Sequence, residues 1–94
     1  KFDSIFASND MIAIGCIDKL LEKGYRIPEH VSVIGYDNTP FSGVIRPHLS
    51  TVNSPVKDLG TEAVKMILRI IFSKNDKKLE KVLDTELIIR DSSV

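Results

Sequence analysis

The chain opens with a short apolar segment and continues with a longer amphipathic one. Residues 2–7 (FDSIFA) are rich in aromatic and aliphatic side chains and have no helical period, which predicts a buried strand. From Asn9 to Lys23 apolar residues recur at every third or fourth position, which predicts a helix. Asn9 is a preferred N-cap residue, Asp10 would lie at the positive end of the helix, and Gly24 is typical of the position just beyond a helix.

A second buried strand is predicted from Val31 to Tyr36 (VSVIGY), whose apolar density suggests that both of its faces are covered. Strand, helix and strand joined by short links form a βαβ unit, so the two strands should lie parallel. A loop with two prolines follows, and Leu49 to Asn53 is expected to be a brief extended segment. The expected fold class is therefore α/β, with a parallel sheet and flanking helices.

The second half of the chain predicts one more helix and one more strand. Ser54 and Pro55 are typical of an N-cap followed by proline at the first helical position, and an apolar stripe continues to about Phe72. The remaining segments are a solvated turn over residues 73–81, a strand over residues 82–89 (VLDTELII) and a terminal tail over residues 90–94.

Composition and charge narrow the classes of function. The formal net charge is zero, with acids and bases mixed along the chain, so no basic surface for nucleic acid is indicated. The single cysteine, Cys16, cannot form an internal disulfide, which fits a reducing compartment, and on the predicted helix it acts as a small hydrophobe. No apolar run approaches the roughly 20 residues of a membrane helix. Because Lys1 leads straight into a strand-like segment, the chain is expected to be a piece of a longer protein.

Motifs for catalysis, cofactors and metals are not found in the sequence. There is no G-x-G-x-x-G, no phosphate-binding loop of the Walker type and no G-x-S-x-G elbow. His30 and His48 stand in predicted loops beside prolines, without a partner at metal-ligand spacing. The sequence therefore predicts neither an enzyme nor a cofactor or metal site.

Two polar clusters each follow a predicted strand. Ser8 to Asp10 follows the first, and Asp37 to Thr39 follows the second. Because the strands should be parallel, both clusters should lie at the same edge of the sheet, where open α/β sheets bind ligands and helix N-termini point. These residues could form a polar ligand site, or they could only cap a helix and make a turn.

Several short motifs, in order and at matching spacing, resemble one family. They are ASND at residues 7–10, Gly24 with IPE at 27–29, VSVIGYDN at 31–38, PHLSTV at 47–52, Leu59-Gly60, and ELIIRDSS at 86–93. Together they resemble the C-terminal part of the effector-binding region of transcriptional regulators of the LacI/GalR type, over nearly the whole chain.

The resemblance implies a periplasmic-binding-protein-like fold of type I, with two α/β lobes joined by crossovers and a ligand held between them. Residues 1–49 would belong to the C-terminal lobe, 50–54 to a crossover, 55–81 to a helix and turn of the N-terminal lobe, and 82–94 to the return crossover and tail. Asn9 and Asp37 match positions that line the effector pocket, and Ser54 matches a crossover position that can reach it.

The partners that the resemblance implies are a sugar-like effector, a second copy of the chain and operator DNA. A homodimer would form through a surface that includes Ile14, Val44 and Ile45, and two of these are apolar residues in a predicted loop where nothing local requires them. DNA would be bound only through a headpiece that this chain lacks. A cytoplasmic protein without a membrane contact is expected.

Two other classes of function remain open at this point. A fragment of a periplasmic sugar-binding transport protein would share the fold, although PHLSTV and ELIIRDSS are more similar to the regulators. A flavodoxin-like enzyme with Asp37 as acid or base would need a second catalytic residue, and none stands out.

Overall fold

The computed structural model describes residues 1–73 and 79–94, so most of the predicted turn over residues 73–81 lies outside the described residues. The chain divides into two compact units. Unit 1 contains Lys1–Ser54 and Glu86–Val94, and unit 2 contains Pro55–Thr85.

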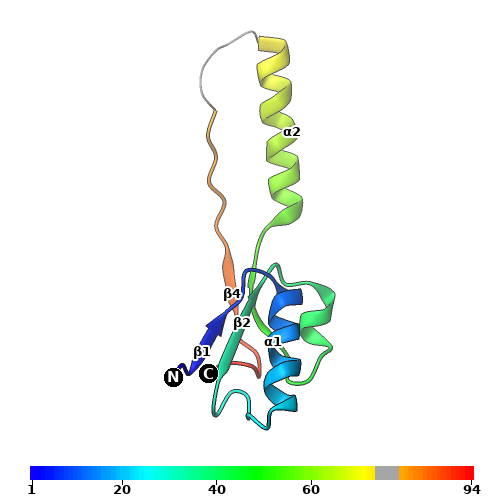
Figure 1. Ribbon diagram of the computed structural model, residues 1–94. Helices are drawn as coiled ribbons and strands as arrows, with labels where there is room; N and C mark the ends of the chain where they lie inside the picture. The colour runs from blue at the N-terminus through cyan, green and yellow to red at the C-terminus, as the bar shows by residue number, and fades with distance from the viewer. Residues whose placement is uncertain (74–78) are drawn as a thin grey trace. The chain divides into compact units, whose positions relative to one another are not determined.

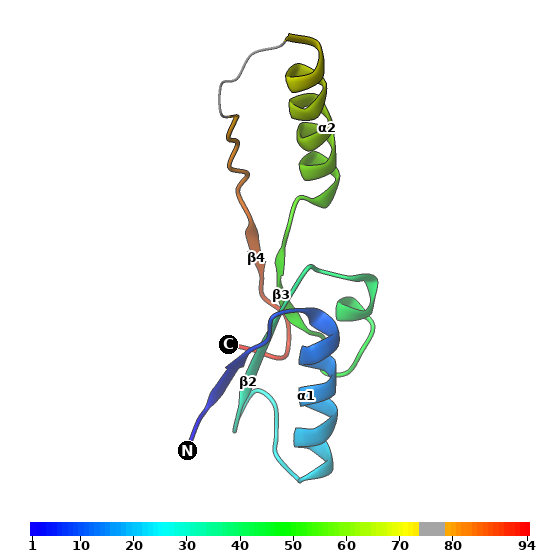
Figure 2. The ribbon, with the colours of Figure 1, turned by 45° about the horizontal axis from the view of Figure 1, so that its top comes forward.

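Unit 1 is built on a sheet of four strands in the order β1-β2-β3-β4. The strands are β1 (Ser4–Phe6), β2 (Ser32–Tyr36), β3 (Ser50–Asn53) and β4 (Glu86–Ile88). The first three are parallel, and β4 is antiparallel to β3. Helix α1 (Asp10–Glu22) lies alongside β2 (Figures 1 and 2). The predicted βαβ unit with parallel strands is confirmed.

Helix α1 begins and ends where its sequence predicts. The Asn9 side chain accepts a hydrogen bond from the backbone N–H of Ile12 at 2.8 Å, and Gly24 has a φ of 83° that favours glycine. The helix buries three residues of its apolar stripe, which are Ala13, Ile17 and Leu20. They form the core with Ala7, Val31, Val33 and Leu49.

The prediction that both faces of β2 are buried is wrong, and so is the prediction of a buried first strand. Val33 and Gly35 of β2 are buried, but Ile34 and Tyr36 on the opposite face are only half-buried. On that face Phe6 of β1 is 69% exposed. Among the described residues of unit 1, α1 is the only α-helix, and one helix covers one face of a sheet.

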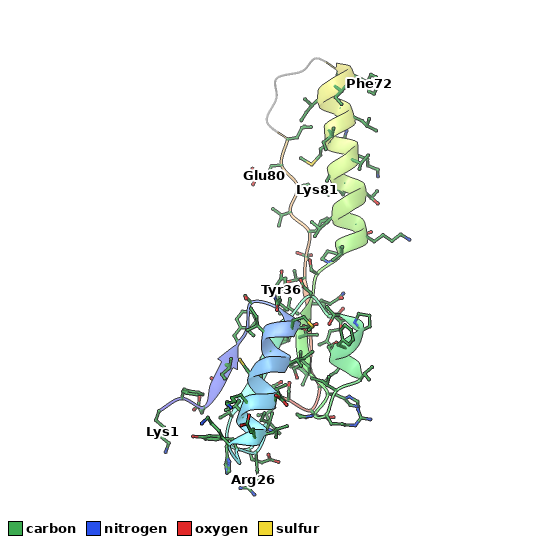
Figure 3. The ribbon with its side chains drawn as sticks, turned by 45° about the vertical axis from the view of Figure 1, so that its right-hand side comes forward. Lys1, Arg26, Tyr36, Phe72, Glu80 and Lys81 are labelled. Carbon is green, nitrogen blue, oxygen red and sulfur yellow. The ribbon has the colours of Figure 1, made fainter. Side chains whose placement is uncertain are left out.

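Unit 2 contains the helix α2 (Val56–Ser73), which begins one residue later than predicted. The carbonyl of Pro55 accepts a hydrogen bond from the backbone N–H of Leu59 at 2.8 Å, so proline precedes the first helical residue. The helix buries none of its residues. Its exposed large apolar residues include Leu59, Val64, Ile67, Leu68, Ile70, Ile71 and Phe72, and the last of these lies near its C-terminal end (Figure 3).

The C-terminal segment differs from its prediction in two ways. The strand over residues 82–89 is shortened to β4, because β3 offers a pairing partner only from Thr51 to Asn53. The tail is not a loose end, since Ser92 and Ser93 are buried. The Ser92 hydroxyl donates to the Val33 carbonyl and accepts from the backbone N–H of Ser50, so the tail is fixed to the sheet.

Gly35 offers a test of how closely α1 approaches the sheet. A Cβ atom there would clash with the carboxylate of Asp10 and lie 3.0 Å from Leu49 Cδ2. We expect Gly35→Ala to lower the free energy of unfolding by about 1–3 kcal/mol, as overpacked cores do. Gly15→Ala is the control: its Cβ meets nothing within 4 Å, and alanine should stabilise the helix by about 0.5–1 kcal/mol. Denaturant unfolding measures both, and equal effects would contradict this packing.

Candidate functional site

The two predicted polar clusters meet at the carboxyl edge of the sheet. The carboxylate of Asp10, in the first turn of α1, accepts hydrogen bonds from the backbone N–H of Thr39 at 2.6 Å and from its hydroxyl at 3.0 Å. Residues separated by 29 positions in the sequence are thereby joined. The prediction that both clusters share one edge is confirmed.

Asp10 has a larger role than the sequence predicts. Its side chain is fully buried, and it also accepts a hydrogen bond from the hydroxyl of Thr51 in β3 at 2.6 Å. A buried carboxylate is costly unless its oxygens receive hydrogen bonds, and here both do. The sequence placed Asp10 in the first turn of the helix and in a polar cluster, but it did not predict a buried acid, because the partners of Asp10 lie 29 and 41 residues away.

Asp37 and Asn38 form a left-handed turn directly after β2. Their φ angles are 104° and 52°, values that few residues other than glycine, asparagine and aspartate adopt. The turn is held by two backbone donors: Asp37 N–H donates to the Val52 carbonyl at 2.9 Å, and Asn38 N–H donates to the Thr51 hydroxyl at 3.2 Å. The Asp37 side chain is exposed and makes no hydrogen bond to the described residues, so its carboxylate is available to a ligand.

The turn and the chain's first residue lie at opposite ends of unit 1. Figure 3 shows Tyr36, the residue before the turn, at one end of the unit and Lys1 and Arg26 at the other. A ligand that contacts Asp37 is therefore remote from the loop that precedes β2.

Each predicted ligand residue is the sequence neighbour of a residue whose side chain is hydrogen-bonded within unit 1. Asn9 precedes Asp10, Asp37 precedes Asn38, and Ser54 follows Asn53, whose side chain accepts a hydrogen bond from the Asn38 amide at 3.1 Å. The Asn9 oxygen is occupied in capping α1, while its amide nitrogen makes no hydrogen bond to the described residues. The Ser54 hydroxyl is likewise without a bond in the described part of the chain, and its side chain is half-buried.

Two of the three residues of the predicted dimer surface also come together. Ile14 of α1 and Ile45, which follows the 3-10 turn η1 (Pro40–Gly43), line one hollow of about 280 Å³. Both are half-buried and pack against the core. Val44 is 71% exposed. The structure therefore brings Ile14 and Ile45 together, whereas Val44 does not line this hollow and adjoins it only as the neighbour of Ile45 in the sequence.

The two histidines and the cysteine lie apart from the polar clusters at the carboxyl edge of the sheet and have separate surroundings. His30 accepts from the backbone N–H of Arg26 at 3.0 Å, and His48 lies 2.9 Å from the Arg46 guanidinium. Cys16 is half-buried on α1. Over residues 1–73 and 79–94 no group of three or more histidine, cysteine or acidic residues could hold a metal ion. In the same ranges no helix has the length and apolar character needed to cross a membrane.

Comparison with known proteins identifies the family. Residues 3–93 match the family described as "Periplasmic binding protein-like domain". The probable HTH-type transcriptional repressor ExuR of Bacillus subtilis is 42% identical over 90 residues, which are 95% of this chain and 27% of that protein. The chain therefore spans about a quarter of the length of this relative.

Solved structures agree in fold and in family. A complex of the transcriptional regulator CelR with cellobiose superposes with a TM-score of 0.91 at 30% identity, over 96% of this chain and 28% of that one. A LacI family regulator from Enterococcus faecium with bound ribose gives a TM-score of 0.84 at 36% identity, over 97% of this chain and 34% of that one. The chain belongs to the periplasmic binding protein-like domain family, in the form found in LacI-type transcriptional regulators.

Proposed function

We propose that these 94 residues are the C-terminal part of the effector-binding domain of a longer, sugar-responsive transcriptional regulator, hereafter the complete regulator. Residues 1–49 would belong to the C-terminal lobe, 50–54 to a crossover, 55–81 to the helix and turn of the other lobe, and 82–94 to the return crossover and tail. The division of the chain into two units supports the boundary after Ser54, while the chain re-enters unit 1 at Glu86, four residues later than the proposed start of the return crossover.

The single observation that carries this proposal is the Asp37 turn. It presents an exposed carboxylate at the carboxyl edge of a parallel sheet, on a backbone fixed by hydrogen bonds to β3. A carboxylate accepts hydrogen bonds from the paired hydroxyls of a sugar. The relatives with cellobiose and ribose bound support a sugar as the effector. Asn9 and Ser54 would complete this chain's share of the site, through an amide donor and a hydroxyl.

The mechanism that we infer is a shift between two arrangements of the lobes, without catalysis. A sugar held between lobes stabilises the arrangement in which both contact it, and this changes the affinity for operator DNA. DNA would be bound by a headpiece outside these residues, in the cytoplasm. The alternative of a transport protein shares the fold, but the relatives described above are named as transcriptional regulators, which favours regulation.

We also infer that the complete regulator is a homodimer and that Ile14, Val44 and Ile45 lie in its interface. Ile14 and Ile45 share one hollow, and the neighbouring Val44 is an exposed apolar residue in a loop. Exposed apolar residues gathered on one surface are typical of a protein–protein contact.

Replacing Asp37 by glycine tests the sugar site. Glycine adopts the left-handed backbone freely, so only the carboxylate is lost and folding should be preserved. We expect binding of a responsive sugar to weaken by about 1.5–3 kcal/mol, the usual contribution of a hydrogen bond to a charged group. Titration calorimetry of the complete regulator with ribose, cellobiose and sucrose measures this, with Asp3→Ala, at an exposed position before β1, as the control. A folded Asp37→Gly variant with wild-type affinity would contradict the assignment.

Replacing Val44 by glutamate tests the dimer. Ile45 packs on the core, so a charge there would unfold the protein, whereas Val44 is exposed and tolerates one in the monomer. Burying an unpaired charge costs several kcal/mol, so we expect Val44→Glu to sediment as a monomer at micromolar concentration. Val94→Glu, at a position that is 99% exposed, should remain dimeric. Sedimentation velocity decides, and a dimeric Val44→Glu variant would remove this surface from the interface.

A further inference from the structure

The side chain of Asn38 joins three segments that are distant in the sequence. Its amide nitrogen donates to the Asn53 side chain at 3.1 Å, and its oxygen accepts from the Arg90 guanidinium at 3.0 Å. The same oxygen accepts from the Ser42 hydroxyl at 3.1 Å. The side chain of Asn38 therefore uses both ends of its amide within unit 1.

The partners of Asn38 stand at the two places where the chain passes between the units. Asn53 is the last residue of β3, just before the chain leaves unit 1. Arg90 follows β4, just after the chain has returned to unit 1 at Glu86. One side chain is thus hydrogen-bonded to both crossing segments, and it belongs to the residue next to Asp37.

Arg90 is held in place by several acceptors. Its guanidinium donates to the Leu49 carbonyl at 2.8 Å and to the Ser42 hydroxyl at 2.9 Å, besides its bond to Asn38. No carboxylate of the described residues lies within 4.0 Å of it, so a neutral amide is one of its main partners. A charge-assisted hydrogen bond of this kind is stronger than a neutral one and fixes the geometry of both groups.

The backbone of Asn38 is also hydrogen-bonded within unit 1. Its N–H donates to the Thr51 hydroxyl, which in turn donates to the buried carboxylate of Asp10. A change in the φ and ψ angles of the turn would therefore disturb the bonds to Asn53 and Arg90. Conversely, a displacement of either crossing segment would disturb the turn.

We propose that Asn38 is a positioning residue that couples a ligand on Asp37 to both crossing segments, through Asn53 on one side and Arg90 on the other. This inference rests on the proposed function and deepens it. A sugar that engages Asp37 fixes the turn, and the fixed turn restrains β3 and β4 at the points where the chain passes between the units.

Four substitutions distinguish the two connections of Asn38, which are the bond to Asn53 and the bond to Arg90. Asn38→Gly removes the side-chain bonds to Asn53, Arg90 and Ser42 and keeps the left-handed backbone. Asn53→Ala removes the bond to β3 and leaves the Asn38 oxygen for Arg90. Arg90→Gln and the conservative Arg90→Lys weaken the bond between Asn38 and residue 90. Arg26→Gln is the matched control, since Arg26 is an exposed arginine of the same unit that contacts His30 instead of Asn38.

The experiment measures hydrogen exchange in the complete regulator with and without a saturating sugar, taken as the tightest binder among ribose, cellobiose and sucrose. In the wild type and in Arg26→Gln we expect the sugar to slow exchange about fivefold or more over residues 50–54 and 86–90. In Asn38→Gly and Arg90→Gln the effect should fall below about twofold, although calorimetry shows the sugar bound. Asn53→Ala should lose it over residues 50–54 and retain it over 86–90.

Each outcome has a distinct meaning. If Asn38→Gly and Arg90→Gln bind the sugar and keep the wild-type response, the inference is overturned while the proposed function stands. If the wild type binds none of the three sugars, the proposed function fails and this inference fails with it. Should Asn38→Gly or Arg90→Gln not fold, Asn53→Ala and Arg90→Lys still decide, since a wild-type response in both would overturn the coupling.

Discussion

The arrangement of unit 1 depends on burying the carboxylate of Asp10. A carboxylate removed from water costs several kcal/mol unless hydrogen bonds replace its hydration. The side chain of Asp10 is fully buried, and its donors are the backbone and hydroxyl of Thr39 and the hydroxyl of Thr51. Helix α1, the loop after β2 and the strand β3 must therefore keep their positions relative to one another. Gly35 permits this approach, because a side chain there would meet the carboxylate.

The same constraint places the candidate ligand residue. The Thr51 hydroxyl donates to the carboxylate of Asp10 and accepts from the backbone N–H of Asn38. One hydroxyl therefore connects the left-handed turn to the buried acid. Asp37 can then remain exposed on a rigid backbone, with its carboxylate free of internal bonds. A binding site gains affinity when its polar groups are held in place before the ligand arrives. The fold, the turn and the proposed sugar site thus have one physical origin.

Local patterns in the sequence predicted the elements well and their long-range partners poorly. The helix from Asn9 to Lys23 and the parallel βαβ unit follow from periodicity and capping, and the meeting of two polar clusters follows from parallel strands. The role of Asp10 did not follow, because its partner Thr51 is 41 residues away. The bond between Asn38 and Arg90 spans 52 residues, and the tail was predicted as a simple end. Burial of β2 on both faces was overestimated, since apolar density does not say whether a second layer is present.

Hydrogen exchange of the Thr39 backbone N–H is the most direct measurement of whether Asp10 organises this edge. Thr39 lies outside the helices and strands, so an amide there would ordinarily exchange rapidly. Its 2.6 Å hydrogen bond to a fully buried carboxylate predicts exchange at least about 100-fold slower than in an unstructured peptide, comparable to the amides of β2. Exchange at the rate of an unstructured peptide, in a protein whose β2 amides are protected, would contradict the account.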